Sequence, residues 1–258
     1  MARLSLRLAP WVSVLAVALA WELFARSGAV TPFMLPKLTT VLGRIWADAA
    51  SGELWHNLGL TLYRALVGFA VAAAVGIALG FAVVYSRAAR WLFDPLISVG
   101  FPMPKIAFLP IITLWLGFYD VAKISMVVFD AIFPVVTATI AATLAVEREL
   151  LWSARNLGAT ERELLREIVF PAALPQIMTG LQVALPIALI VGIVAEMKLG
   201  GVGLGGAMIT ASRFADSPGV FAGIVEIAIA GYGLVRVMAV LRRRLLAWHP
   251  ETAAPATV

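Results

Sequence analysis

The sequence predicts an all-α integral membrane protein with about six transmembrane helices. Of its 258 residues, 62% are hydrophobic and only 14% are charged, whereas ordinary soluble domains carry about 25% charged residues. Residues 65–86 and residues 168–195 contain no charged side chain, and a helix needs ~20 apolar residues to cross the hydrocarbon core. This composition leaves too few polar atoms to cover a water-facing surface.

Six apolar segments account for the hydrophobic sequence. They lie near residues 9–26, 65–86, 95–118, 124–145, 174–196 and 219–241. The first begins with basic residues, as a signal peptide does, but it is longer than a typical h-region and ends at Arg26 without a clear cleavage site, so we interpret it as a retained span. Residues 27–60 are too polar to cross and predict a loop followed by an amphipathic helix at the membrane surface. We expect one transmembrane domain over residues 1–258.

The placement of Lys and Arg predicts the orientation in the membrane. With the N-terminus inside, the cytoplasmic segments hold eleven basic residues and the opposite side holds seven. Both termini are then cytoplasmic, and so is the charged segment 147–171. The formal net charge is +5, and the basic residues lie at the ends of apolar runs. This placement is typical of loops that face lipid headgroups and not of a nucleic-acid-binding surface.

Residues 147–171 form a charged, helix-forming segment between two very apolar runs. Each charge at the centre of a transmembrane helix costs about 2.5–3.5 kcal/mol, so this segment lies in water or against protein. Its apolar face has roughly helical spacing and consists of Leu150, Ala154, Leu157, Leu164, Leu165 and Ile168. Two interpretations follow: a plain surface helix between two spans, or a docking element for a groove on a cytoplasmic partner.

The same segment resembles the EAA loop of permease subunits of ATP-binding-cassette (ABC) importers. The motif has E-A-A, three residues, G, nine residues, then I-x-L-P. Matching positions here hold Ser153, Ala154, Gly158, Ile168 and Pro171, with Trp152 at the position of the Glu. SARNLGATERELLREIVFPAALPQIMTGL is similar to the branch that imports nitrate, sulfonates and taurine, and so are FPMPKIAFLPIITLWLGF, AEMKLGGVGLGGAMITAS and RRRLLAW.

The resemblance implies a type I ABC importer permease fold in the bacterial inner membrane. Two copies of the permease would pair, and two copies of a separate ATPase would bind ATP and Mg²⁺. A periplasmic or lipid-anchored binding protein would deliver a small solute such as a sulfonate, taurine or a nitrate-like anion. The chain itself would bind no cofactor and would not be an enzyme. The implied ATPase-coupling residues are Trp152, Ser153, Ala154, Arg155, Gly158, Ala159, Thr160, Glu161, Ile168 and Pro171.

Motifs for nucleotide or metal chemistry are missing from the sequence itself. G-x-x-x-x-G-K-[ST] does not occur, so the chain cannot cradle ATP phosphates in the P-loop manner. The formal G-x-G-x-x-G at Gly201, Gly203 and Gly206 follows an apolar span and not a strand, so we interpret it as a flexible outer loop, part of a gate or of a binding-protein contact. Zero Cys and two His predict no metal site.

Polar residues near the spans supply candidates for the translocation pathway or gate, because ionisable groups are costly there and usually face a cavity or a partner. These candidates are Lys105, Asp130 and Glu196, together with the apolar Met197 beside Glu196. Lys105 either meets an anionic solute or extends toward the headgroups. Asp130 fits a helix-packing role better than a ligand role, and Glu196, beside Met197, either serves a gate or lies in the interface.

Two other function classes compete with the importer. A self-contained secondary transporter or channel would not need a docking helix and would usually show inverted repeats, which are not evident. An intramembrane enzyme would need a catalytic constellation, and H-E-x-x-H, G-x-S-x-G and Cys are all absent. The three classes differ in whether activity needs an added ATPase, an ion gradient alone or a chemically converted substrate.

Overall fold

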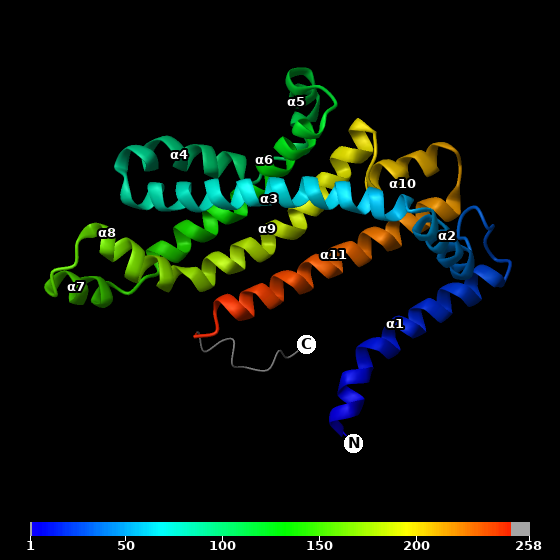
Figure 1. Cartoon of the computed structure of the whole chain (residues 1–258), viewed down its shortest axis with the longest axis horizontal. Coiled ribbons are helices and arrows are strands. Elements are labelled where there is room, and N and C mark those ends of the chain that lie inside the picture. The colour runs from blue at the N-terminus through cyan, green and yellow to red at the C-terminus, as the bar shows by residue number, and fades with distance from the viewer. Residues whose placement is uncertain (1, 249–258) are drawn as a thin grey trace. The chain divides into compact units, whose positions relative to one another are not determined.

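The computed structural model describes residues 2–248, with side chains from Val12 onward, and contains helices but no strand in that range. The elements are α1 (Ala2–Arg26), α2 (Leu38–Ser51), α3 (Glu53–Tyr85), α4 (Arg87–Gly100), η1 (Lys105–Phe108), α5 (Leu109–Leu116), α6 (Asp120–Leu144), α7 (Arg148–Asn156), α8 (Glu161–Glu163), η2 (Leu164–Val169), α9 (Phe170–Leu199), α10 (Leu204–Arg213) and α11 (Ser217–Leu245) (Figure 1). They form two compact units: residues 2–60 with 196–230, and residues 61–195 with 231–248.

Four helical runs among the described residues are long and apolar enough to cross a membrane: α3, α6, α8–η2–α9 and α11. Helix α4 and the η1–α5 segment are long and apolar enough only when taken together, and their two parts meet at 99°, which is the geometry of a broken span or of a re-entrant loop. The segment predicted to span near 95–118 is therefore broken, because Pro102 and Pro104 cannot donate helical hydrogen bonds. The span predicted near 9–26 falls in α1, partly outside the residues with described side chains, and stays a prediction.

Helix α6 is central to the second unit. Glycines of three other helices pack against it so closely that an added methyl group would overlap α6, and these are Gly68, Gly76 and Gly80 in α3, Gly100 in α4 and Gly180 in α9. Small residues let transmembrane helices approach closely, and the resulting van der Waals packing stabilises their association. The buried hydroxyls of Thr139 and Thr143 donate to carbonyls one turn earlier, at 2.8 and 2.7 Å, so neither is left unsatisfied.

The first unit contains α1, α2, the start of α3, the last residues of α9, α10 and the first part of α11. Helix α2 is the amphipathic helix expected between residues 27 and 60, and it ends at Gly52, whose φ of 86° is left-handed. Helix α3 starts immediately afterwards, earlier than the predicted span near 65–86. Trp21 of α1 joins two parts of this unit: its ring lies 5.6 Å from that of Phe221, and its Nε1 donates to the Pro36 carbonyl at 2.9 Å.

Candidate functional site

The predicted ATPase-coupling segment consists of two short helices joined by a tight turn in the second unit (Figure 1). At the end of α7, the Gly158 N–H donates to the Arg155 carbonyl and the Ala159 N–H donates to the Ala154 carbonyl, each at 3.0 Å. This is the Schellman pattern that closes a helix C-terminus. Gly158 has a φ of 87°, and no atom lies within 4 Å of the place where a Cβ would be. Glycine is therefore favoured here because it adopts the left-handed backbone conformation, and not because a side chain would collide with the rest of the chain.

A capping box starts α8 two residues later. The Thr160 hydroxyl accepts from the Glu163 backbone N–H at 3.3 Å, and the Glu163 carboxylate accepts from the Thr160 backbone N–H at 2.7 Å. Across the turn, the Arg155 guanidinium lies 3.0 Å from the Glu161 carboxylate. Both of those side chains are exposed, so the ion pair contributes little stability. The turn is defined by its backbone hydrogen bonds and its cap.

Helix α8 continues through η2 into α9, and residues 161–199 make one helical run of 39 residues. The η2 segment has the wide i→i+5 hydrogen bonding of a π-helix. Pro171 and Pro175 follow it, and a proline cannot donate to the carbonyl four residues earlier, which favours a loosened turn at this place. The coupling segment is thus attached to a transmembrane helix without an intervening loop.

The predicted apolar face of the coupling segment divides into two parts. Ala154 and Leu164 are buried, but Leu150 is exposed and Leu157 is 87% exposed at the turn. The motif residues divide similarly. Exposed side chains or positions are Trp152, Ser153, Arg155, Gly158, Thr160 and Glu161, half-buried ones are Ala159, Ile168 and Pro171, and Ala154 is buried. A short helical element that presents exposed apolar side chains has the features of a helix that binds in a groove.

Lys105 and Asp130 form an ion pair in the second unit. The Lys105 ammonium lies 3.3 Å from the Asp130 carboxylate, donates to the Phe101 carbonyl at 2.8 Å, and lies 4.6 Å from the centre of the Phe133 ring. Lys105 is buried at the bend between α4 and α5, so its side chain does not extend to the surface of this unit. Its charge is balanced by Asp130 and is not presented to a solute in this arrangement.

Glu196 and Met197 lie near the end of α9 in the first unit. Glu196 is fully buried, and its carboxylate accepts from the Gly205 backbone N–H at 3.1 Å, whereas Met197 is half-buried. A second side chain reaches the same glycine-rich segment, since the Asn57 Oδ1 accepts from the Gly203 N–H at 2.9 Å. The segment interpreted as a flexible outer loop is therefore held by two buried side chains.

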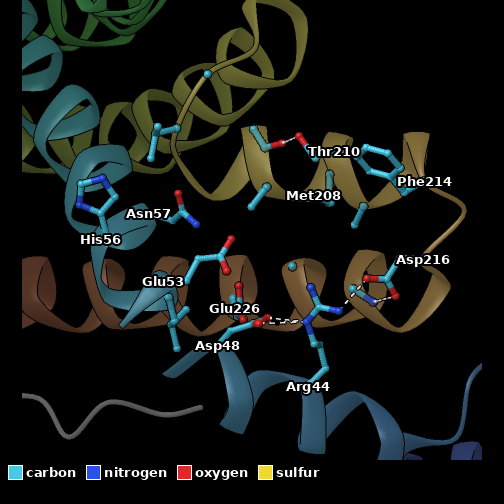
Figure 2. Close-up of a pocket in the computed structure, with 18 residues that line it drawn as sticks. Arg44, Asp48, Glu53, His56, Asn57, Met208, Thr210, Phe214, Asp216 and Glu226 are labelled. Atoms are coloured by element: carbon cyan, nitrogen blue, oxygen red, sulfur yellow. Dashed lines mark hydrogen bonds and ion pairs between the residues drawn. The ribbon is translucent and has the colours of Figure 1, made fainter. Parts of the chain in front are cut away.

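A cavity of about 440 Å³ opens in the first unit, between α2, the start of α3, the glycine-rich segment, α10 and α11 (Figure 2). Its charged lining is mostly acidic and comprises Asp48, Glu53, Asp216, Glu226 and one guanidinium, that of Arg44. Figure 2 shows Arg44 between Asp48 and Asp216, at 2.9 and 2.7 Å. Burial lowers the pKa of Arg44, but hydrogen bonds and charges from these two carboxylates outweigh it, so the pKa lies above its ordinary value.

Three residues of these sites were not found by sequence reasoning: Asn57, Glu163 and Arg44. Glu163 had a recognisable signal, because Thr160 followed three residues later by Glu is the capping-box pattern. Asn57 contacts a residue 146 positions away and Arg44 contacts one 172 positions away. Neither distant contact has a local signature in the sequence.

Comparisons with known proteins agree with this architecture. The family described as "binding-protein-dependent transport system inner membrane component" matches residues 72–247. The putative aliphatic sulfonates transport permease protein SsuC of Bacillus subtilis is 32% identical over 229 residues, which are 89% of this chain and 83% of that protein. The taurine transport system permease protein TauC of Escherichia coli is 31% identical over 246 residues, 93% of this chain and 90% of that protein.

Among solved structures, the fold is similar to that of a chain in the crystal structure of an amino acid ABC transporter with histidines. The TM-score is 0.63 at 17% identity, and the match covers 77% of this chain and 96% of that chain. At this identity the likeness concerns the fold alone.

Proposed function

Because the chain belongs to the family of binding-protein-dependent transport system inner membrane components, we propose that two copies of it pair to form the pathway of an ATP-driven importer. Each copy is the membrane-spanning permease subunit and is not the enzyme of the system. ATP and Mg²⁺ are bound by a separate ATPase, since the sequence has no P-loop motif. The observation that carries the proposal is the coupling segment, a fixed helical turn with exposed apolar side chains on an uninterrupted transmembrane helix.

The coupling segment suits the transfer of motion from an ATPase. The turn at residues 157–160 is closed by its own backbone hydrogen bonds. A partner that binds this turn therefore moves it as a rigid unit. The motif residues from Trp152 to Glu161 make the contact, and Ile168 and Pro171 belong to the run that continues into α9. Movement of the ATPase subunits then displaces α9 and the helices packed on it.

The proposed arrangement in the cell follows from the distribution of basic residues. Both termini and residues 147–171 face the cytoplasm, where the ATPase is, and the chain acts as a single permease domain in the inner membrane. A binding protein, periplasmic or lipid-anchored, delivers the solute on the other side. One binding protein and two ATPase subunits serve each permease pair.

The proposed solute is a small anion of the sulfonate, taurine or nitrate kind. The support is the similarity to permeases named for aliphatic sulfonates and taurine. Lys105 contributes to anion attraction only when its ion pair with Asp130 opens, because the carboxylate 3.3 Å away balances its charge otherwise. Selection of the solute therefore rests mainly on the binding protein. The pathway and its gate are shaped by Lys105, Asp130, Glu196 and Met197.

A pull-down from detergent tests the proposal. Tagged permease is co-expressed with the ATPase encoded beside it. The wild-type permease is compared with two variants: one in which a Gly/Ser linker replaces residues 153–163, and Leu157→Ala. Leu114→Ala is the matched control, because Leu114 is exposed to a similar degree, 82% against 87%, but lies in α5. We expect two ATPase chains per permease pair for the wild type and the control, and loss of capture for the linker variant.

Equal capture of the ATPase by the linker variant would exclude docking at residues 153–163. Transport that runs on an ion gradient alone, in liposomes without ATPase, would instead support a secondary transporter or channel. Reconstituted transport of a radiolabelled sulfonate, which requires ATP, the ATPase and the binding protein, is the positive outcome.

A further inference from the structure

The carboxylate of Glu196 lies at the N-terminus of α10, a helix whose own cap residue has no side chain. Gly203 is the N-cap of α10, and the Glu196 carboxylate accepts from the N–H of Gly205, the second residue of the helix. A negative charge at a helix N-terminus is stabilised by the helix dipole and by the free N–H groups there. Glu196 thus caps α10 from seven residues upstream of the N-cap, at the end of another helix.

Gly203 is shaped to admit this carboxylate. Its φ is 137°, a conformation that side chains rarely adopt, and a Cβ at this position would overlap the carboxylate of Glu196. The first turn of α10 is also tight, because a Cβ at Gly206, the third residue of the helix, would overlap the Gly201 carbonyl. The glycines of this segment therefore let the chain close over the buried Glu196 side chain, and they do not make the segment flexible.

Asn57 holds the same segment from a different helix. Its side-chain oxygen accepts from the Gly203 N–H at 2.9 Å, and it is almost fully buried at the start of α3. Gly201, Val202, Gly206 and Asn57 all line the 440 Å³ cavity of the first unit (Figure 2). One wall of that cavity is consequently fixed by two hydrogen-bonding side chains, one from α9 and one from α3.

We propose that Glu196 and Asn57 are positioning residues that clamp residues 200–206 to the last turn of α9 and to the start of α3. This cavity wall then moves together with α9 during transport. The inference rests on the proposed function, because it assigns a task to the end of α9 that lies opposite the coupling segment. Helix α9 is continuous with α8, so displacement of the coupling segment reaches Glu196 along one helix. The clamp passes that displacement to the cavity wall.

A spin label tests the clamp in the isolated permease. The chain has no cysteine, so Val202→Cys, at a half-exposed position of the segment, accepts a single nitroxide. We expect an immobile spectrum in the otherwise wild-type chain and a mobile component after Glu196→Ala or Asn57→Ala. Glu196→Gln keeps an acceptor oxygen and should restore immobility, and Lys198→Ala, an exposed neighbour on α9, is the control. An unchanged spectrum in both alanine variants would overturn the clamp.

A second measurement tests its role in coupling. In liposomes with ATPase and loaded binding protein, we expect Glu196→Ala and Asn57→Ala to lower binding-protein-stimulated ATP hydrolysis about tenfold, within the usual range of coupling between sites. Capture of the ATPase and basal hydrolysis should remain at wild-type levels in Asn57→Ala, and Glu196→Gln, which keeps an acceptor oxygen, should recover stimulation. If Glu196→Ala does not reach the membrane, Asn57→Ala serves alone.

The outcomes separate the two proposals. Wild-type permease that fails to capture the ATPase contradicts the proposed function, and the spin-label measurement still tests the clamp. Normal stimulation in alanine variants whose label has become mobile contradicts the coupling role, even though the wild-type complex works.

Discussion

Two turns of this chain join helices through left-handed glycines, yet they are held in opposite ways. The turn at residues 157–160 is fixed by hydrogen bonds among neighbours, and Gly158 faces open space. The segment at residues 200–203 is fixed by Glu196 and Asn57, and Gly203 has no room for a Cβ. The first turn is a self-sufficient local structure with a free outer surface, which suits contact with a partner. The second depends on its surroundings, which suits transmission of motion within the chain.

Gly203→Ala should have the largest effect. The left-handed φ strains an alanine, and the methyl group would displace the Glu196 carboxylate from its hydrogen bond to the Gly205 N–H, at a combined cost of about 3 kcal/mol. We expect a lower midpoint of thermal unfolding in detergent and loss of stimulated ATP hydrolysis. Gly200→Ala is the control, because it has a φ of 71° but open space, and it should cost about 1 kcal/mol. Equal effects of the two changes would show that steric closure at Gly203 is unimportant.

Gly158→Ala should cost about 1–2 kcal/mol, from the left-handed backbone alone. Gly233→Ala is the matched control in α11, where the added methyl group also has open space but the φ is not positive. Gly158→Arg adds a long side chain at the exposed turn, and we expect the protein to insert normally while ATP-driven transport is lost. Normal transport by Gly158→Arg would remove this position from the partner contact.

Thr160→Ala should destabilise the coupling turn by about 1 kcal/mol, because the Glu163 N–H loses its side-chain acceptor. Hydrogen exchange of the amides in residues 160–163 measures the effect directly, and Thr160→Ser, which keeps the hydroxyl, should match the wild type. Exchange in residues 200–206 should not change. A change there would mean that the two turns are not held independently.

Arg155→Ala should have the smallest effect, about 0.5 kcal/mol or less, since Arg155 and Glu161 are both exposed. The same variant in the ATPase pull-down asks whether Arg155 contacts the partner. Weaker capture without loss of thermal stability would assign Arg155 to the interface, and loss of stability would instead mean that the ion pair holds the turn. The double variant with Glu161→Ala separates their mutual contribution.

The difference between the two turns also explains what sequence reasoning found. The helical class was predictable from composition, and the helices between residues 147 and 171 were predictable because the spacing from Trp152 to Pro171 is a local property. The coupling role of these helices stays a proposal. The break in the span near 95–118 was signalled by prolines, but its angle of 99° depends on packing. Glu196 was named as a gate candidate, but its cap on Gly205, nine residues later, depends on the backbone path of the glycine-rich segment. The hydrogen bond from Gly203 to Asn57 joins residues 146 positions apart and has no local signature.

The π-helical stretch at residues 164–169 has a consequence for insertions and deletions. A π-turn holds about one residue more than an α-turn, so removing one residue from this stretch would tighten it into an α-helix and leave the orientation of α7 and α8 about the axis of α9 nearly unchanged. Each residue of an α-helix turns the chain by about 100°, so removing one residue from the α-helical part of α9 would instead rotate α7 and α8 by roughly that angle. The side chains that we propose to bind the ATPase would then face a different direction, although none of them had been substituted. The rotation of the turn at residues 157–160 about the axis of α9 thus depends on the number of residues between them. Evolution must preserve that number separately from the identity of any residue.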